Sequence, residues 1–257
     1  SIFTPIFILY PVAEIEVLAR KEVFIFCIFL CYLFFKNPLN RNLYKIFILP
    51  IAVLIWEPVI FYFLFFLIFD ITKDKLKKIN IKFLLNLVCY IPALILAAYI
   101  ALNPITSENH QIMASNLKNN FGEICYMSCA LLKSKSSIYA QFEGNLGKYS
   151  FEIFLRYFLI ILFGFGPLII LLKNSSLKNL DLLFFKHFKD LFLPNVLILS
   201  PVILLFAMGY DWGRWVNISY VFSIIFYTYL YLNKMILLDQ NFLKNKFLKY
   251  LDEKKFF

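Results

Sequence analysis

The stretch that decides the fold runs from Leu191 to Leu232 and has the sequence LFLPNVLILSPVILLFAMGYDWGRWVNISYVFSIIFYTYLYL. Two apolar runs, Leu191–Met208 and Trp215–Leu232, flank the pentapeptide Asp211-Trp212-Gly213-Arg214-Trp215. Each run approaches the roughly 20 apolar residues with which an α-helix crosses a hydrocarbon core about 30 Å thick. The stretch therefore predicts two membrane-spanning helices joined by a short polar turn.

The whole chain has the same character, because 61% of its 257 residues are hydrophobic and 20% are aromatic. Soluble domains contain roughly 45–50% apolar residues. The apolar runs lack the alternation of barrel strands, so the composition predicts an all-α, polytopic membrane protein with about six to seven transmembrane segments. Besides the two runs above, the candidates are Ile2–Ala19, Val23–Phe35, Tyr44–Phe69, Phe83–Leu102 and Phe151–Leu172.

Two features concern the start of the chain. The run Val23–Phe35 is too short to cross alone, so either it extends through Arg20 or it forms a broken or re-entrant pair with Ile2–Ala19. The chain begins with Ser1 and is apolar from Ile2. We expect a single membrane domain over 1–257 that lacks some N-terminal spans.

The basic residues lie in the connections between the runs, and the formal net charge is +10. A nucleic-acid-binding protein would carry such charge on a soluble basic face, whereas in a membrane protein it marks the cytoplasmic side and attracts anionic lipids. We therefore expect membrane lipids and no nucleic acid as partners. The expected inner segments are Ile71–Lys82, Lys173–Lys189 and the tail 233–257, with Arg20 and Lys21. The expected outer segments are Lys36–Lys45, Asn103–Ser150 and Asp211–Arg214.

Two polar segments have patterns of their own. The tail 233–257 has the lysines and spaced apolar residues of an amphipathic helix on the inner leaflet, or of a plain cytoplasmic cap. The long loop Asn103–Ser150 predicts a surface helix that either covers a groove or packs on the bundle. Its Cys125 and Cys129 are four residues apart, so a disulfide between them is an open alternative.

The cysteines and the two histidines have no metal-binding spacing, and the chain has no phosphate-binding loop. We expect neither a metal nor another cofactor. The candidate catalytic residues are Asp211, Arg214 and Glu57.

Glu57 lies within Tyr44–Phe69, beside Pro58, where a carboxylate at membrane depth is functional or bonds to a neighbouring helix. Asp211 and Arg214 form either a site or a local ion pair. Trp212 and Trp215 are either belt residues or a platform for a sugar ring.

Arg20 before one run, Trp56-Glu57-Pro58 in a later one, a long outer loop and the turn Asp211–Trp215 together resemble bacterial polysaccharide polymerases of the EpsG and O-antigen polymerase type. Members of that family tend to have a histidine where this chain has Trp56-Glu57. The resemblance implies a multi-pass protein of the bacterial inner membrane that joins undecaprenyl-diphosphate-linked oligosaccharides at the outer face.

On this resemblance Arg214 holds the diphosphate, Asp211 or Glu57 serves as base, and Trp212, Trp215 and Arg20 bind substrate. The alternatives are a glycosyltransferase of the GT-C type that uses a lipid-phosphate sugar, a transporter or flippase for lipid-linked glycans, and a non-catalytic assembly subunit. Only a polymerase lengthens the glycan of purified lipid-linked units.

Overall fold

The computed structural model describes residues 22–103, 105–125, 138–147, 149–178, 182–209 and 212–239. These residues are mostly helical, as the composition predicts. The helices are α2 (Glu22–Phe34), α3 (Pro38–Ile55), η2 (Glu57–Tyr62), α4 (Phe63–Lys73), α5 (Ile81–Val88), α6 (Ile91–Leu102), α7 (Ser107–Phe121), α9 (Ile138–Leu146), α10 (Phe151–Lys173), α11 (Phe192–Ile198), η3 (Ser200–Val202), α12 (Ile203–Met208) and α13 (Trp212–Leu232). Two short strands, β1 (Ser175–Leu177) and β2 (Ile236–Leu238), pair antiparallel.

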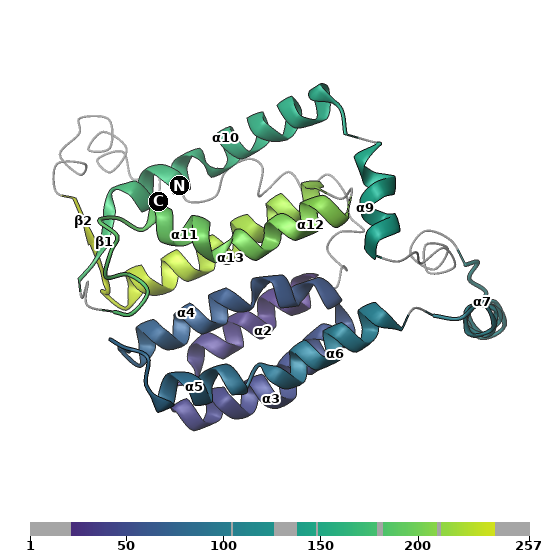
Figure 1. Cartoon of the computed structure of the whole chain (residues 1–257), viewed down its shortest axis with the longest axis horizontal. Coiled ribbons are helices and arrows are strands. Elements are labelled where there is room, and N and C mark those ends of the chain that lie inside the picture. Colours follow the sequence, from purple (N-terminus) through teal and green to yellow (C-terminus); the bar gives the residue numbers. More distant parts are fainter. Residues whose placement is uncertain are drawn as a thin grey trace.

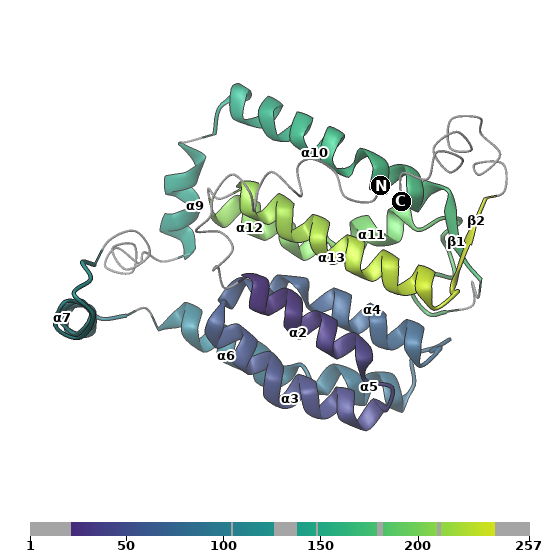
Figure 2. The ribbon, with the colours of Figure 1, turned by 180° about the vertical axis from the view of Figure 1, so that it is seen from behind.

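The helices form two groups that lie against each other, α2 to α6 and α10 to α13 (Figures 1 and 2). Among the described residues, four helices are long and apolar enough to cross a membrane: Pro38–Ile55, Ile81–Leu102, Phe151–Lys173 and Trp212–Leu232. The chain is therefore an α-helical membrane protein.

Helix α13 lies at the centre of the bundle, since 67% of its most apolar window is buried, against 17% for α10. Its Phe222 contacts rings from both α2 and the η2–α4 segment, with centroid distances of 4.9 Å to Phe29 and 4.8 Å to Tyr62. The outward side of α10 instead presents large apolar side chains such as Phe158 and Phe163. Such a surface is stable in lipid and costly in water.

The run Tyr44–Phe69, expected as one span, is a helical hairpin. Lys45 and Asp70 would lie about 37 Å apart along one continuous helix, yet Lys45 Nζ lies 2.7 Å from Asp70 Oδ2. Helix α3 ends at Ile55, and Trp56 takes an extended conformation (φ −156°, ψ 98°). Pro58 restricts Glu57 before it and donates no hydrogen bond, so the chain turns there and returns as η2 and α4.

This extra crossing reverses the expected direction of the described residues upstream of it. Arg41 pairs with Asp74, so Lys36–Lys45 lies at the same end of the bundle as Ile71–Lys82 and not opposite to it. Glu22, next to Arg20 and Lys21, lies at the other end, beside Arg214. The expected sidedness of Lys36–Lys45 relative to Ile71–Lys82 was wrong, because alternation had been counted through one span where there are two. Arg20 and Lys21 lie outside the described residues.

We name the two ends by their residues. The tryptophan end carries the three tryptophans, Trp56, Trp212 and Trp215, with Glu22, Glu57 and the start of α10. The lysine end carries the start of α3, the ends of α4, α10 and α13, and the β1–β2 pair. The described lysines at this end are Lys36, Lys73, Lys75, Lys77, Lys78, Lys82, Lys173, Lys178, Lys186, Lys189 and Lys234.

The remaining expectations meet the structure in part. The surface helix expected in Asn103–Ser150 corresponds to α7, which stands away from the bundle, while α9 contacts α12 (Figure 1). The expected run Leu191–Met208 is broken into α11, η3 and α12, with Pro201 in η3. Within the tail, β2 is a strand, and residues 240–257 lie outside the described part, as does Ile2–Ala19.

Candidate functional site at the tryptophan end

The candidate site begins with Arg214 on the first turn of α13. The pentapeptide was expected to be a turn between spans, but Trp212 to Trp215 already belong to the helix. Arg214 Nε lies 3.0 Å from Oε1 of Glu22, the first residue of α2. The Arg214 side chain is 25% exposed, so this cation is held at the edge of the bundle and remains within reach of a ligand.

Glu22 is the buried partner of this pair and is only 7% exposed. Within the described residues, neither carboxylate oxygen of Glu22 accepts a hydrogen bond, although Oε1 forms the ion pair with Arg214. Buried polar atoms in folded proteins almost always have a hydrogen-bond partner, and an unsatisfied one marks strain, a ligand or a water site. Glu22 is the residue of this site that the sequence did not reveal.

The two indoles of the pentapeptide pack into the protein, and each is 7% exposed. The ring centroids of Trp215 and Trp56 lie 5.9 Å apart, and Trp212 donates its indole N–H to the carbonyl of Phe206 at 2.8 Å. The rings around Trp212 are those of Tyr149, Phe154, Tyr157 and Phe206. These contacts hold α13 against α10 and α12, and they leave no open indole face as the predicted sugar platform.

Tyr149, just before α10, links this segment to the end of α12. Its hydroxyl donates to the carbonyls of Phe206 and Ala207 at 2.9 and 3.1 Å. Burial raises the pKa of Tyr149 above its ordinary value, so the hydroxyl stays protonated as a donor. The start of α13 is thus packed from several directions, which fixes where Arg214 lies.

Glu57 lies at the tip of the α3–η2 hairpin, next to Trp56, and its side chain is exposed. It had been expected in the interior of a span. Because the run folds back at this point, Glu57 lies at the end of the bundle, where a carboxylate meets water or lipid head groups. The structure therefore brings Glu57, Trp212, Arg214 and Trp215 to one end. Asp211 and Arg20 lie outside the described residues.

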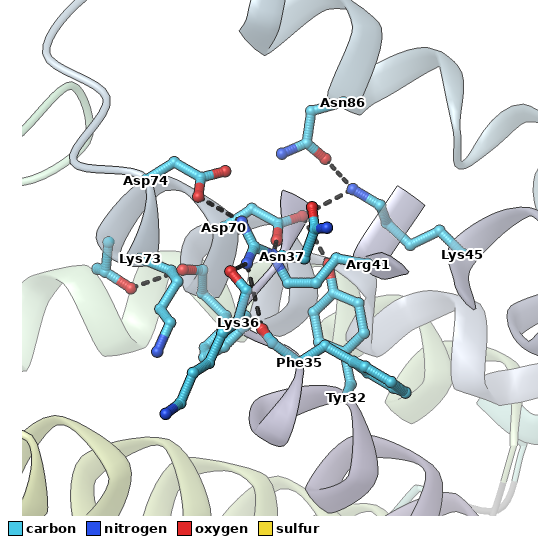
Figure 3. A network of polar contacts seen from close by, with 12 residues as sticks. Tyr32, Phe35, Lys36, Asn37, Arg41, Lys45, Asp70, Lys73, Asp74 and Asn86 are labelled. Carbon is cyan, nitrogen blue, oxygen red and sulfur yellow. Dashed lines mark hydrogen bonds and ion pairs between the residues drawn. The ribbon is translucent and has the colours of Figure 1, made fainter. Parts of the chain in front are cut away.

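A second polar cluster, the buried charge network, lies toward the lysine end (Figure 3). Asp70 on α4 accepts hydrogen bonds from Arg41 Nε at 2.7 Å, Lys45 Nζ at 2.7 Å and the Tyr32 hydroxyl at 2.6 Å. Arg41, Lys45 and Asp70 are at most 1% exposed. Arg41 and Lys45 had been expected in the outer segment Lys36–Lys45, and no role had been predicted for either of them or for Asp70.

The buried charge network is internally balanced. Arg41 also binds Asp74 and the carbonyls of Phe35 and Lys36, and Lys45 also binds Asn86. The two cations thus face two carboxylates, and most of their donors are used by the protein. Such a network fastens α3 to α4 and α5, which is a structural task.

Among the described residues, no group of His, Cys, Asp and Glu side chains could hold a metal ion. Cys125 is disulfide-bonded, and its Sγ lies 3.5 Å from His110 Nε2. Cys129 lies outside the described residues, so its pairing stays a prediction.

An open pocket of about 340 Å³ lies at the lysine end beside the β1–β2 pair, between Lys173, Lys189 and Asp239.

Comparison with models of known protein families, with curated proteins and with solved structures finds no match for this chain.

Proposed function

We propose that the protein is a membrane-embedded glycan polymerase that joins lipid-diphosphate-linked oligosaccharides at its tryptophan end. The observation that carries the proposal is Arg214, a partly exposed guanidinium held by a buried carboxylate at the membrane-water boundary. The proposed location is the outer face of the bacterial inner membrane, with undecaprenyl diphosphate as the lipid carrier.

The position of Arg214 suits a lipid diphosphate. An isoprenoid tail lies in the hydrocarbon and its diphosphate lies at the interface, the same depth as the first turn of a spanning helix. Arginine offers a planar fork of N–H donors that matches phosphoryl oxygens, and the N-terminus of α13 adds the positive end of a helix dipole.

The carboxylates at the tryptophan end supply the second requirement of the reaction. Glycosyl transfer needs a base to take the proton of the acceptor hydroxyl while the diphosphate departs with the bonding electrons of the anomeric carbon. Glu57 and Glu22 both lie at the end that carries Arg214. The proposal needs no metal or nucleotide, since the lipid diphosphate is itself the leaving group.

The distribution of lysines supports the proposed orientation. The lysine end carries a dense group of basic residues, and cytoplasmic loops of membrane proteins have such an excess. The tryptophan end would then face outward, where lipid-linked units are joined.

A transporter or flippase for lipid-linked glycans is the second candidate. It is favoured by the broken helices: α3 ends at Trp56 before Pro58, and α11, η3 and α12 divide one apolar run. Discontinuous helices form the binding sites of many transporters. The two candidates differ in their product, because only a polymerase lengthens the glycan.

The test is polymerisation by the purified protein in detergent, starting from lipid-linked oligosaccharide units. The wild type should produce longer glycans, and Arg214→Ala should lose at least about 100-fold in rate, as expected for removal of a charged group that binds the leaving diphosphate. Arg214→Lys should recover only a small part. Arg156→Ala is the matched control, since Arg156 is an exposed arginine near the start of α10.

Two results would contradict the proposal. Transfer of lipid-linked units across vesicles without chain growth would make the protein a flippase. Recovery of full activity in the double variant Glu22→Gln with Arg214→Gln, after loss in each single variant, would reduce the pair to a structural link between α2 and α13.

A further inference from the structure

We infer that Glu22 is the general base of the proposed transfer, the group that receives the proton of the attacking sugar hydroxyl. This inference rests on the proposed function and deepens it. Glu57 and Asp211 had been the expected bases, and Glu22 is separated from Arg214 by most of the chain. Glu22 belongs to the site only because α2 and α13 lie side by side with their first turns at the same end of the bundle.

The first argument is the state of the Glu22 carboxylate. The Glu22 side chain is 9% exposed, and neither of its oxygens accepts a hydrogen bond from the described residues. Burying a carboxylate without hydrogen bonds is unfavourable, even when a cation is near. A ligand hydroxyl that donates to the carboxylate would remove this penalty, and this is the contact that a general base makes before proton transfer.

The second argument is the distance to Arg214. Glu22 Oε1 lies 3.0 Å from Arg214 Nε. A lipid diphosphate bound to the same guanidinium would place the anomeric carbon of its attached sugar close to this carboxylate. Glu57, by contrast, is exposed at the hairpin tip.

The step balances as follows. The acceptor hydroxyl oxygen forms a bond to the anomeric carbon of the donor, and its proton passes to Glu22. The bond between that carbon and the diphosphate oxygen breaks, and both electrons leave with the lipid diphosphate, whose charge Arg214 stabilises. Glu22 later returns the proton to water.

The experiment separates chemistry from donor binding. Purified wild type, Glu22→Gln and Arg214→Ala are compared in two assays: steady-state polymerisation from pH 5 to 9, and binding of a polyisoprenyl diphosphate that carries no sugar. Glu22→Gln should lower kcat by about 100- to 10,000-fold, the range of general-base catalysis. It should change diphosphate affinity less than about threefold. It should also remove the loss of rate on acidification that a carboxylate base is expected to give the wild type. Arg214→Ala should lose the affinity.

A Glu22→Gln protein that retains kcat, or that loses diphosphate affinity as Arg214→Ala does, would overturn the inference and leave Glu22 as a residue that only orients Arg214. If Glu22→Gln does not fold, Glu22→Asp provides the second readout: the carboxylate is retained but withdrawn, so kcat should fall while the acid limb stays. An unchanged kcat in Glu22→Asp would also overturn the inference. A wild type that binds the diphosphate but never lengthens a glycan would refute the proposed function itself.

Discussion

At the residue scale, the position of Glu57 decides whether its carboxylate needs a buried partner. As an intramembrane carboxylate it would require a buried partner, whereas at the hairpin tip its exposed side chain meets the interface. On the proposed function its negative charge lies beside the path of the acceptor sugar. Its role should therefore appear in activity and not in stability.

We predict that Glu57→Gln folds as the wild type does, with a change in stability within about 0.5 kcal/mol, as is usual for exposed positions. Its polymerisation rate should fall several-fold. Glu152→Gln is the control, since Glu152 is an exposed glutamate on the first turn of α10. Equal rates in the two variants would remove Glu57 from the site.

The sequence predicted some of these residues and could not have predicted others. Arg214 and the two indoles stand out because a short polar segment interrupts two apolar runs. Glu22 has no such signal, since its importance comes from a contact with a residue 192 positions away in sequence. In the sequence it is only the acidic neighbour of Arg20 and Lys21.

At the element scale the decisive feature is the α3–η2–α4 hairpin. Its sequence signal was present: Lys45 and Asp70 bracket an apolar run that Trp56-Glu57-Pro58 interrupts near its middle. Hydropathy alone merges the two halves, because the interruption is short and each half of the apolar run Tyr44–Phe69 is shorter than a usual span. The helices themselves were predictable, but the turn between them depended on one proline and one charge.

The buried charge network makes the hairpin testable. We predict that Asp70→Asn destabilises the protein by about 3–5 kcal/mol, because it leaves Arg41 and Lys45 buried beside an uncharged group. Asp74→Asn should cost less, since Asp74 is 25% exposed and water can replace part of the lost interaction. Unfolding by denaturant in detergent measures both.

A double change checks the origin of the effect. Lys45→Met combined with Asp70→Asn removes one of the two stranded cations, so it should be less destabilising than the sum of the two single changes. Strict additivity would show that Lys45 and Asp70 do not interact across the hairpin. The hairpin would then lack its main polar link.

At the scale of the whole molecule, the account depends on which residues share an end of the bundle. The lysine-rich segments predicted one end correctly for Ile71–Lys82, Lys173–Lys189 and the residues just after α13, which the β1–β2 pair and the contact of Lys73 with Tyr229 bring together. Lys36–Lys45 was assigned to the wrong end relative to Ile71–Lys82, because a topology counted by alternation carries every missed crossing through the remaining chain.

The separation of the two ends has a direct functional consequence. Arg214, Glu22 and Glu57 lie at the end opposite to the lysines. A polymerase of lipid-linked units needs them on the outer side, and the excess of lysine at the other end favours this orientation. The hairpin and the orientation together give one prediction about accessibility.

The most direct test is labelling with a membrane-impermeant thiol reagent. Single cysteines are introduced at Asn40, Lys78 and Ser107, each exposed, in a chain whose five native cysteines are replaced. In intact cells, Ser107→Cys should be labelled from outside, whereas Asn40→Cys and Lys78→Cys should react only after the membrane is opened. Labelling of Asn40→Cys from outside together with Ser107→Cys would contradict the hairpin and the placement of Glu22 beside Arg214.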